Sequence, residues 1–212
     1  MGAATMAGLH DHRVLACGKH FPGHGDTSKD SHLELPAVTV SRERLEAVEL
    51  TPFRYAIQRG LQAMMTAHVH YPSLDTTNPA TLSYPILSEL LRRDMGFQGL
   101  IFSDDLEMRA ILNHSSIGDA AVRSLQAGVD ILLICKTREL ETQAIEAVRQ
   151  AVDSGEIPPK ILETREARLQ HVKQQFVHPF QPVEPTRIKH MVGITSHQIL
   201  LSQIQEQSRT VI

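Results

Sequence analysis

The sequence predicts an α/β fold in which short parallel strands alternate with helices. Four short apolar runs occur along the chain, and each is followed by a segment whose apolar residues recur at helical spacing. The run at residues 129–135 is apolar at nearly every position, as expected of a strand in a parallel sheet covered on both faces. Polar clusters follow two of the runs, at the strand ends where parallel α/β folds place active sites. These observations favour parallel βαβ units with right-handed crossovers.

The expected elements follow from apolar spacing and from start and stop residues. Strands are predicted at residues 13–17, 63–68, 100–103 and 129–135. Helices are predicted at residues 41–59, 86–95, 117–127, 138–153 and 160–176. Ser83 has the character of an N-cap with Pro85 in the first turn, while Gly96 and Gly128 are typical helix stops.

The last part of the chain differs from the rest. Pro179, Pro182 and Pro185 interrupt residues 177–212, so we predict a linker followed by a helix at residues 197–208. The predicted organisation is therefore one α/β domain at residues 1–176 and a linker with a C-terminal helix at residues 177–212.

Composition excludes several classes of protein. The chain has 212 residues, of which 42% are hydrophobic and 21% charged, enough for one sizeable core. A net charge of -3 without blocks of like charge argues against nucleic acid or an anionic membrane as a partner. No signal peptide or membrane-spanning run is recognisable, so we expect a soluble cytoplasmic protein. Cys17 and Cys135 lie in apolar runs, and we expect both to be buried as small hydrophobic residues.

The first polar cluster occupies residues 19–32, directly after an apolar run. It is rich in glycine and contains Lys19, His20, Asp30 and His32. A carboxylate close to an imidazole fixes its tautomer and raises its basicity, which suits a general acid/base. The alternative is a polar loop that only caps a sheet.

The second polar cluster follows the apolar run at residues 100–103. Asp104 and Asp105 both stand at the end of this run. Adjacent residues of a strand point to opposite faces, so only one of the two can face a site. Either carboxylate is a candidate nucleophile or base at this point.

The twelve histidines raise the question of a metal site. His20, His24 and His32 share one segment, and His68 and His70 lie at another strand end, so a zinc site is conceivable. The spacings match no standard ligand set, and no phosphate-binding loop or dinucleotide fingerprint is present. We therefore expect no metal and no cofactor, with His68 and His70 on opposite faces and one of them an ordinary hydrogen-bonded residue.

Together the two clusters resemble the family 3 glycoside hydrolases, in particular their bacterial β-N-acetylglucosaminidase branch. The run Lys-His-Phe-Pro-Gly-His-Gly-Asp-Thr, then Asp-Ser-His, and a glycine, three apolar residues, a serine and an aspartate at residues 99–104 carry the resemblance. It extends over residues 9–176. It implies the later half of a (β/α)8 TIM barrel, units five to eight, with residues 3–12 ending the preceding helix and a C-terminal helical tail.

The resemblance also implies roles for individual residues. Asp104 would be the nucleophile, His32 the acid/base, and Asp30 the residue that orients His32. Lys19 and His20 would bind hydroxyls of the terminal sugar. Asp30 as a solvated loop carboxylate, and Lys19 as the partner of a loop aspartate, are the structural alternatives.

The implied activity is retaining hydrolysis of terminal β-N-acetylglucosamine from N-acetylglucosaminides of the cell-wall muropeptide type, through a covalent glycosyl-aspartate. A β-glucosidase or a phosphorylase of the same family is the alternative enzyme. The alternative without catalysis is a half-barrel that acts through oligomerisation. A homodimer, or a separate N-terminal half-barrel, is the expected protein partner, because half a barrel leaves sheet edges unpaired.

Overall fold

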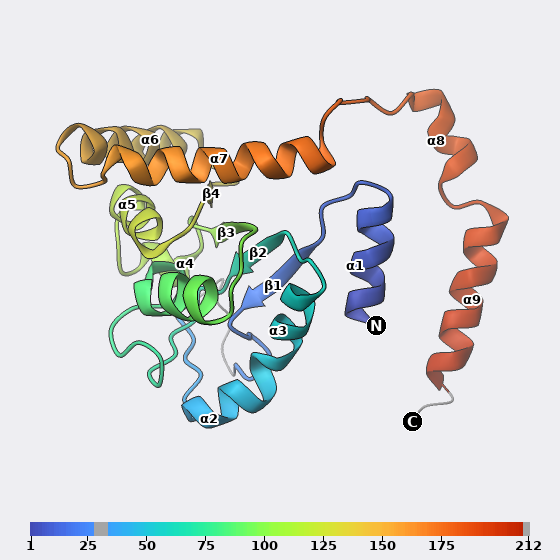
Figure 1. Cartoon of the computed structure of the whole chain (residues 1–212), viewed down its shortest axis with the longest axis horizontal. Helices are drawn as coiled ribbons and strands as arrows, with labels where there is room; N and C mark the ends of the chain where they lie inside the picture. Colours follow the sequence, from blue (N-terminus) through green and yellow to red (C-terminus); the bar gives the residue numbers. More distant parts are fainter. Residues whose placement is uncertain (28–33, 210–212) are drawn as a thin grey trace. The chain divides into compact units, whose positions relative to one another are not determined.

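The computed structural model describes residues 1–27 and 34–209, which form two units, Met1–Val177 and His178–Ile212. The first unit contains a parallel sheet whose strands follow each other in chain order (Figure 1). Its strands among the described residues are β1 (Cys17–Phe21), β2 (Ala63–Thr66), β3 (Leu100–Asp105) and β4 (Ile131–Leu133). The predicted α/β class with parallel strands is confirmed.

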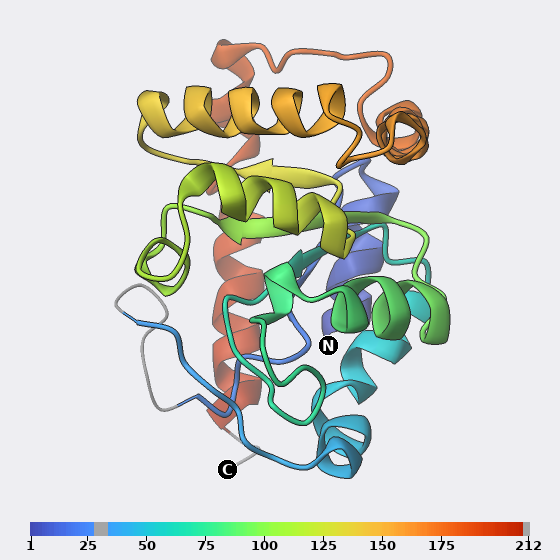
Figure 2. The same cartoon turned by 90° about the vertical axis from the view of Figure 1, so that its left-hand side faces the viewer.

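Helices connect the strands and follow the last of them. Before β1 lies α1 (Gly2–Asp11), and β1 leads to β2 through α2 (Arg42–Arg44), η1 (Leu45–Glu49) and α3 (Thr51–Gln58). Between β2 and β3 lie η2 (Ala80–Leu82) and η3 (Pro85–Asp94), and between β3 and β4 lie α4 (Arg109–Leu112) and α5 (Ile117–Ala127). After β4 come α6 (Arg138–Asp153) and α7 (Pro159–Phe176), which lie on the β4 side of the sheet in Figures 1 and 2.

The first strand starts later than predicted. The expected strand at residues 13–17 is wrong, because Arg13 adopts a φ of 58° and the chain turns there. The strand begins at Cys17, which pairs with Ala63 of β2. Pairing with a distant strand, not the local apolar run, therefore sets its limits. As a result Lys19 and His20 lie within β1 and do not follow it.

The other strands confirm the prediction with shifted ends. β2 and β4 are shorter than expected, while β3 continues two residues further, to Asp105. Asp104 thus lies within β3, where the pairing with β4 is irregular between Phe102 and Asp105, and Asp105 pairs with Leu133 of β4.

Helix ends follow the local start and stop residues closely. α5 has the predicted limits, with the hydroxyl of Ser116 accepting from the backbone N–H of Asp119 at 3.1 Å and Gly128 at a φ of 125° after the last turn. The hydroxyl of Ser83 accepts from the N–H of Ile86 at 3.2 Å, which confirms the predicted cap. Within the predicted helices at residues 41–59 and 86–95, η1 and η3 are wider π-helical turns.

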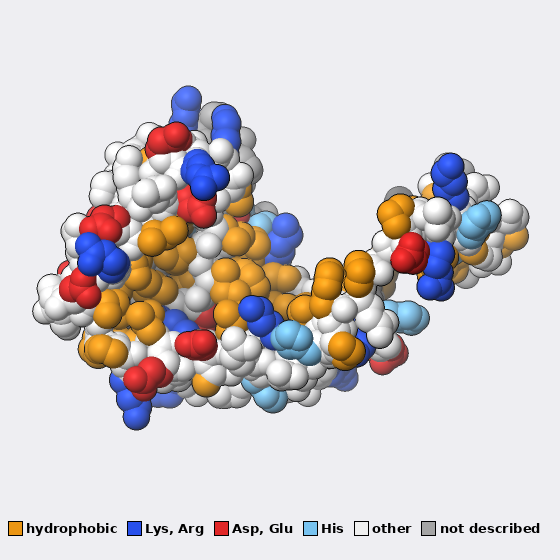
Figure 3. Space-filling model, turned by 90° about the horizontal axis from the view of Figure 1, so that it is seen from above, with side chains coloured by type: hydrophobic (Ala, Val, Ile, Leu, Met, Phe, Trp, Pro, Cys, Tyr) orange, Lys and Arg blue, Asp and Glu red, His pale blue; other side chains and the backbone are white. Residues whose placement is uncertain are grey.

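The core lies on one face of the sheet. Met64 and Ile101 are fully buried there together with residues of α1, η1 and η3. On the opposite face Met65, Phe102 and Leu133 are only half-buried. That face is covered unevenly, because Ala63 and Leu100, which share it with Met65 and Phe102, are buried. Figure 3 shows hydrophobic side chains gathered in a hollow on one face of the first unit.

Both cysteines are free and exposed, contrary to the prediction of burial. Gly18 packs against Leu61 and Met64 of the buried cluster, so its neighbour Cys17 leaves the strand on the opposite face. Cys135 lies just beyond the end of β4. An apolar run alone does not reveal which of its faces another element covers.

The second unit consists of α8 (Pro185–Met191) and α9 (Thr195–Arg209). The predicted C-terminal helix corresponds to α9, whereas α8 lies in the predicted linker and begins at Pro185, a residue tolerated in a first helical turn. Every side chain described at residues 178–208 is exposed. No helix in the described part of the chain is long and apolar enough to cross a membrane.

Candidate active site

The carboxyl ends of β1 and β3 bring His20 and Asp104 together. His20 Nε2 lies 3.7 Å from Asp104 Oδ2, although β2 runs between the two strands. The side chains of His20 and Asp104 are 28% and 21% exposed to solvent, so a small polar ligand can reach both. This pair is the centre of the candidate site.

The neighbouring carboxylates Asp104 and Asp105 have different surroundings. Asp104 Oδ1 accepts from the backbone N–H of Asp105 at 2.9 Å, which leaves Oδ2 toward His20. Asp105 Oδ1 instead accepts from the N–H groups of Glu107 at 3.1 Å and Cys135 at 3.3 Å. Asp105 therefore fastens two loops, and Asp104 is the carboxylate beside the histidine. That Asp104 is the nucleophile stays a prediction.

Glu107 fastens the same region from the other side. Its Oε1 accepts from the N–H of Thr137 at 2.7 Å and its Oε2 from that of Lys136 at 2.8 Å. Loss of hydration opposes ionisation, but these hydrogen bonds prevail and lower the pKa of Glu107. An ionised Glu107 thus joins the segment after β3 to the start of α6.

A buried histidine, His68, hydrogen-bonds to the backbone of the candidate site, although the sequence did not assign it to the site. His68 follows β2 and is fully buried. Its Nε2 lies 2.9 Å from the carbonyl oxygen of Asp105, which can only accept, so Nε2 carries the proton. Its Nδ1 lies 2.7 Å from the hydroxyl of Thr81, which is also 2.8 Å from the hydroxyl of Thr66. His68 thereby holds the backbone beside Asp104.

The charge states of the two histidines follow from burial. Burial lowers the pKa of His68, while the hydrogen bond to Asp105 and the charges of Asp104 and Asp105 oppose this shift. Burial also lowers the pKa of His20; the carboxylate of Asp104 opposes the shift, and the charge of Lys19 adds to it. Both imidazoles are therefore neutral at neutral pH.

The remaining predicted residues are placed differently. Lys19 is exposed and directly precedes His20 in β1, where the pairing with β2 shifts register between Gly18 and Phe21. Its charge acts on His20, whose pKa it helps to lower. Asp30 and His32 lie outside the described residues, so their roles as orienting residue and acid/base stay predictions.

The histidines at the end of β2 bond to protein atoms. His70 Nε2 lies 3.0 Å from the carbonyl oxygen of Asp75, and both nitrogens of His68 are in use. The prediction set one of these residues aside as an ordinary hydrogen-bonded side chain, and both are hydrogen-bonded. Within the described ranges, no three His, Cys, Asp or Glu side chains are grouped so that they could hold a metal ion.

Comparison with protein families gives a match over most of the chain. Residues 1–172 match the model of the glycosyl hydrolase family 3 N terminal domain. The matched segment includes both polar clusters and all four strands described above.

Relatives of known name point the same way. The chain is 40% identical over 179 residues to a β-hexosaminidase of Nitrosomonas eutropha, covering 82% of this chain and 48% of the relative. It is 44% identical over 149 residues to a β-hexosaminidase of Neisseria meningitidis serogroup C, covering 70% of this chain and 41% of the relative. The chain thus spans about half or less of the length of these curated relatives.

Among solved structures, the fold is similar to that of a family 3 β-N-acetylglucosaminidase from a Paenibacillus species. The TM-score is 0.82 with 40% sequence identity, over 86% of this chain and 36% of the other. A β-N-acetylglucosaminidase from Thermotoga maritima gives a TM-score of 0.74 and 33% identity, over 80% of this chain and 37% of the other. Strand-end polar residues, a parallel sheet and these matches lead to one conclusion: the chain belongs to glycosyl hydrolase family 3.

Proposed function

We propose that this chain carries the nucleophile half of a retaining β-N-acetylglucosaminidase. The observation that supports this most strongly is the geometry at the end of β3. There the Asp104 carboxylate has one oxygen held by the backbone and the other turned toward His20, while Asp105 is occupied elsewhere. The names of the relatives, β-hexosaminidase and β-N-acetylglucosaminidase, support the choice of sugar.

The proposed reaction has two steps. Asp104 Oδ2 attacks the anomeric carbon, the bond from that carbon to the leaving oxygen breaks, and His32 gives its proton to that oxygen. Water then attacks the same carbon and releases Asp104, and His32 takes up the proton that water loses. In this scheme Asp30 orients His32.

His20 and Lys19 have binding roles in the proposal. A neutral His20 can exchange hydrogen bonds with a sugar hydroxyl near Asp104 without adding a charge to the site. Lys19 supplies a cationic donor from the adjacent position of β1. The finer substrate, a muropeptide fragment of the cell wall recycled in the cytoplasm, follows from the resemblance and belongs to the proposal.

The proposed architecture is that β1 to β4 are strands five to eight of a (β/α)8 barrel. Four parallel strands in chain order among the described residues support it, as does the match to the family model over residues 1–172. The half-buried face of the sheet would then be the face turned toward the barrel interior.

Covalent trapping tests the nucleophile even at low turnover. A fluorinated N-acetylglucosaminyl fluoride has a leaving group that needs no proton, and its ring fluorine slows the second step, so the glycosyl-enzyme accumulates. We expect mass spectrometry to find one added sugar on the peptide that contains Asp104. Asp104→Asn should remove the label, while Asp105→Asn, the matched control, should keep it. A label on another residue, or none on the unsubstituted chain, would contradict the proposal.

A further inference from the structure

A separate group of charged residues, centred on Asp130, lies at the opposite end of the sheet from His20 and Asp104. Asp130 directly precedes β4, and its side chain is only 1% exposed. Its Oδ2 accepts from the backbone N–H of Ile101, near the start of β3, at 2.7 Å. This cluster is therefore separate from the candidate active site, which lies at the carboxyl ends of the strands.

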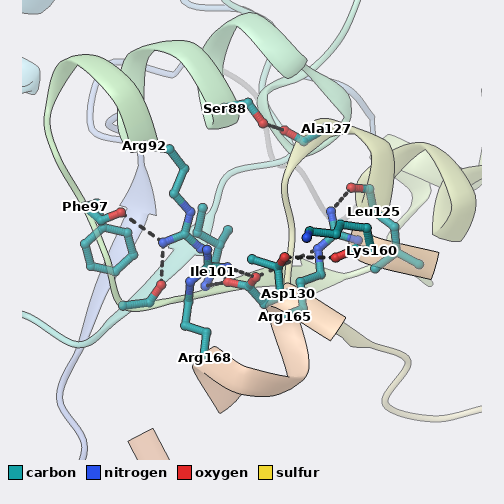
Figure 4. A network of polar contacts seen from close by, with 12 residues as sticks. Ser88, Arg92, Phe97, Ile101, Leu125, Ala127, Asp130, Lys160, Arg165 and Arg168 are labelled. Carbon is teal, nitrogen blue, oxygen red and sulfur yellow. Dashed lines mark hydrogen bonds and ion pairs between the residues drawn. The ribbon is translucent and has the colours of Figure 1, made fainter. Parts of the chain in front are cut away.

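Three arginines converge on this one carboxylate (Figure 4). Arg92 of η3 donates to Asp130 Oδ2 at 2.5 Å and to the carbonyl oxygen of Gly99 at 2.5 Å. From α7, Arg168 donates to Asp130 Oδ1, and Arg165 Nε lies 3.9 Å from the same oxygen. The arrangement anchors η3 and α7 to the sheet.

The contacts with Asp130 leave an excess of positive charge, because three guanidinium groups share one carboxylate. Burial lowers the pKa of Arg92 to about 10; Asp130 opposes the shift, and the charges of Arg168 and Arg165 add to it. All three guanidiniums are nonetheless charged at neutral pH, against a single carboxylate. One nitrogen, Arg165 Nη1, is buried and has no hydrogen-bond partner among the described residues.

A cavity of about 350 Å³ opens beside these arginines. Lys160, in the first turn of α7, adds a fourth cationic group to its wall, and Ser88, Gln98 and Thr164 add neutral polar groups. No acidic residue is among the described residues that line it. The cavity is therefore a basic recess, and Arg165, one of its lining residues, has a buried guanidinium nitrogen without a partner among the described residues.

We propose that this recess binds a phosphate group, either inorganic phosphate or a phosphomonoester. Guanidinium groups present pairs of N–H donors that match two phosphate oxygens, and a lysine adds a compact positive charge. A dianion would balance the excess charge that Asp130 leaves and would accept from Arg165 Nη1. A purely structural ion cluster would explain the bonds to Asp130, but it would explain neither the unpartnered nitrogen nor the placement of Lys160.

Calorimetric titration with inorganic phosphate, in chloride buffer at constant ionic strength, tests the proposal. We expect saturable binding of one phosphate per chain and about tenfold weaker binding in Lys160→Met. Lys173→Met, an exposed lysine on the same helix outside the recess, is the matched control and should bind as the unsubstituted chain does. A hexose phosphate titrated in parallel shows whether free phosphate or a monoester is the better ligand.

A second variant tests the recess by adding a negative charge, whereas Lys160→Met removes a positive one. Thr164→Glu places a carboxylate in the exposed part of the wall, so it should abolish phosphate binding while raising the melting temperature. Absence of saturable binding, equal affinity in Lys160→Met and Lys173→Met, or equal binding of acetate would overturn the proposal. Loss of binding in Lys19→Met and not in Lys160→Met would also overturn it, because the anion would then lie at the candidate active site.

Discussion

His68 links the ionisation of one buried residue to the stability of the site. Its proton on Nε2 bonds to the carbonyl of Asp105, and its Nδ1 accepts from Thr81. Protonation of Nδ1 would place two donors face to face unless the threonine hydroxyl turned away. Burial, the largest influence, lowers the pKa of His68 below its usual value of 6.5.

The sign of the resulting pH dependence is fixed. Below about pH 6.5 the unfolded chain binds a proton at this position that the folded chain does not, so the free energy of unfolding falls as the pH falls. The loss stops once the pH passes below the pKa of the folded state. We expect His68→Gln to remove this contribution, up to about 1.4 kcal/mol per pH unit, because its amide can replace both hydrogen bonds without titrating.

Urea denaturation at a series of pH values measures this slope. His114→Gln changes an exposed histidine and is the matched control, and His20 contributes in the same pH range to both variants. An unchanged slope in His68→Gln would show that the folded protein accommodates a charged His68.

At the scale of elements, Gly99, just before β3, lies close against Gln62, just before β2. A Cβ at Gly99 would lie 2.3 Å from the carbonyl oxygen of Gln62, a backbone atom that also accepts from Leu100. We expect Gly99→Ala to lower the free energy of unfolding by about 1–3 kcal/mol, because β2 and β3 must separate. Gly25→Ala, where an added Cβ would have no described atom beyond its chain neighbours within 4 Å, should change it by less than about 0.5 kcal/mol in the same denaturation experiment. Similar values for the two variants would contradict this explanation.

The elements also show which features a sequence can predict. The limits of α5 and α6 follow from signals within a few residues, such as Gly128 at a positive φ, and the prediction of both is confirmed. The start of β1 depends on pairing with β2, more than forty residues away, and the prediction was wrong by four residues. The π-helical turns of η1 and η3 have no comparable local signal.

In the candidate site, too, local sequence signals could be predicted from the sequence, and contacts between distant segments could not. The sequence identified His20 and Asp104 because polar residues directly after apolar runs share one edge of a parallel sheet. It could not separate Asp104 from Asp105 without the resemblance, since their surroundings depend on the N–H groups of Glu107 and Cys135. Nor could it assign His68 a role, because its partner Thr81 lies in a separate 3-10 turn.

At the scale of the whole molecule, the first unit has an apolar surface beside β4. A cavity of about 430 Å³ lies there, lined by Leu132, Ile134 and Ile145 among others. Ile145 of α6 is 62% exposed. Open sheet edges and exposed apolar patches promote association.

We therefore expect light scattering to report a dimer or a larger species. Ile145→Lys should shift the chain toward the monomer, because a charge at this surface opposes apolar contact. Tyr84→Lys, at a side chain that is 57% exposed elsewhere on the unit, is the matched control and should not. A monodisperse monomer of the unsubstituted chain would contradict the expectation.

The carboxylate of Glu107 has a consequence for how the molecule moves. By accepting from the N–H groups of Lys136 and Thr137, it shields from hydrogen exchange two amides that stand in an otherwise accessible connection. The end of β3, with Asp104 on it, is thereby tied to the long helix α6. Motion of that helix and motion of the strand end are therefore coupled through the Glu107 carboxylate.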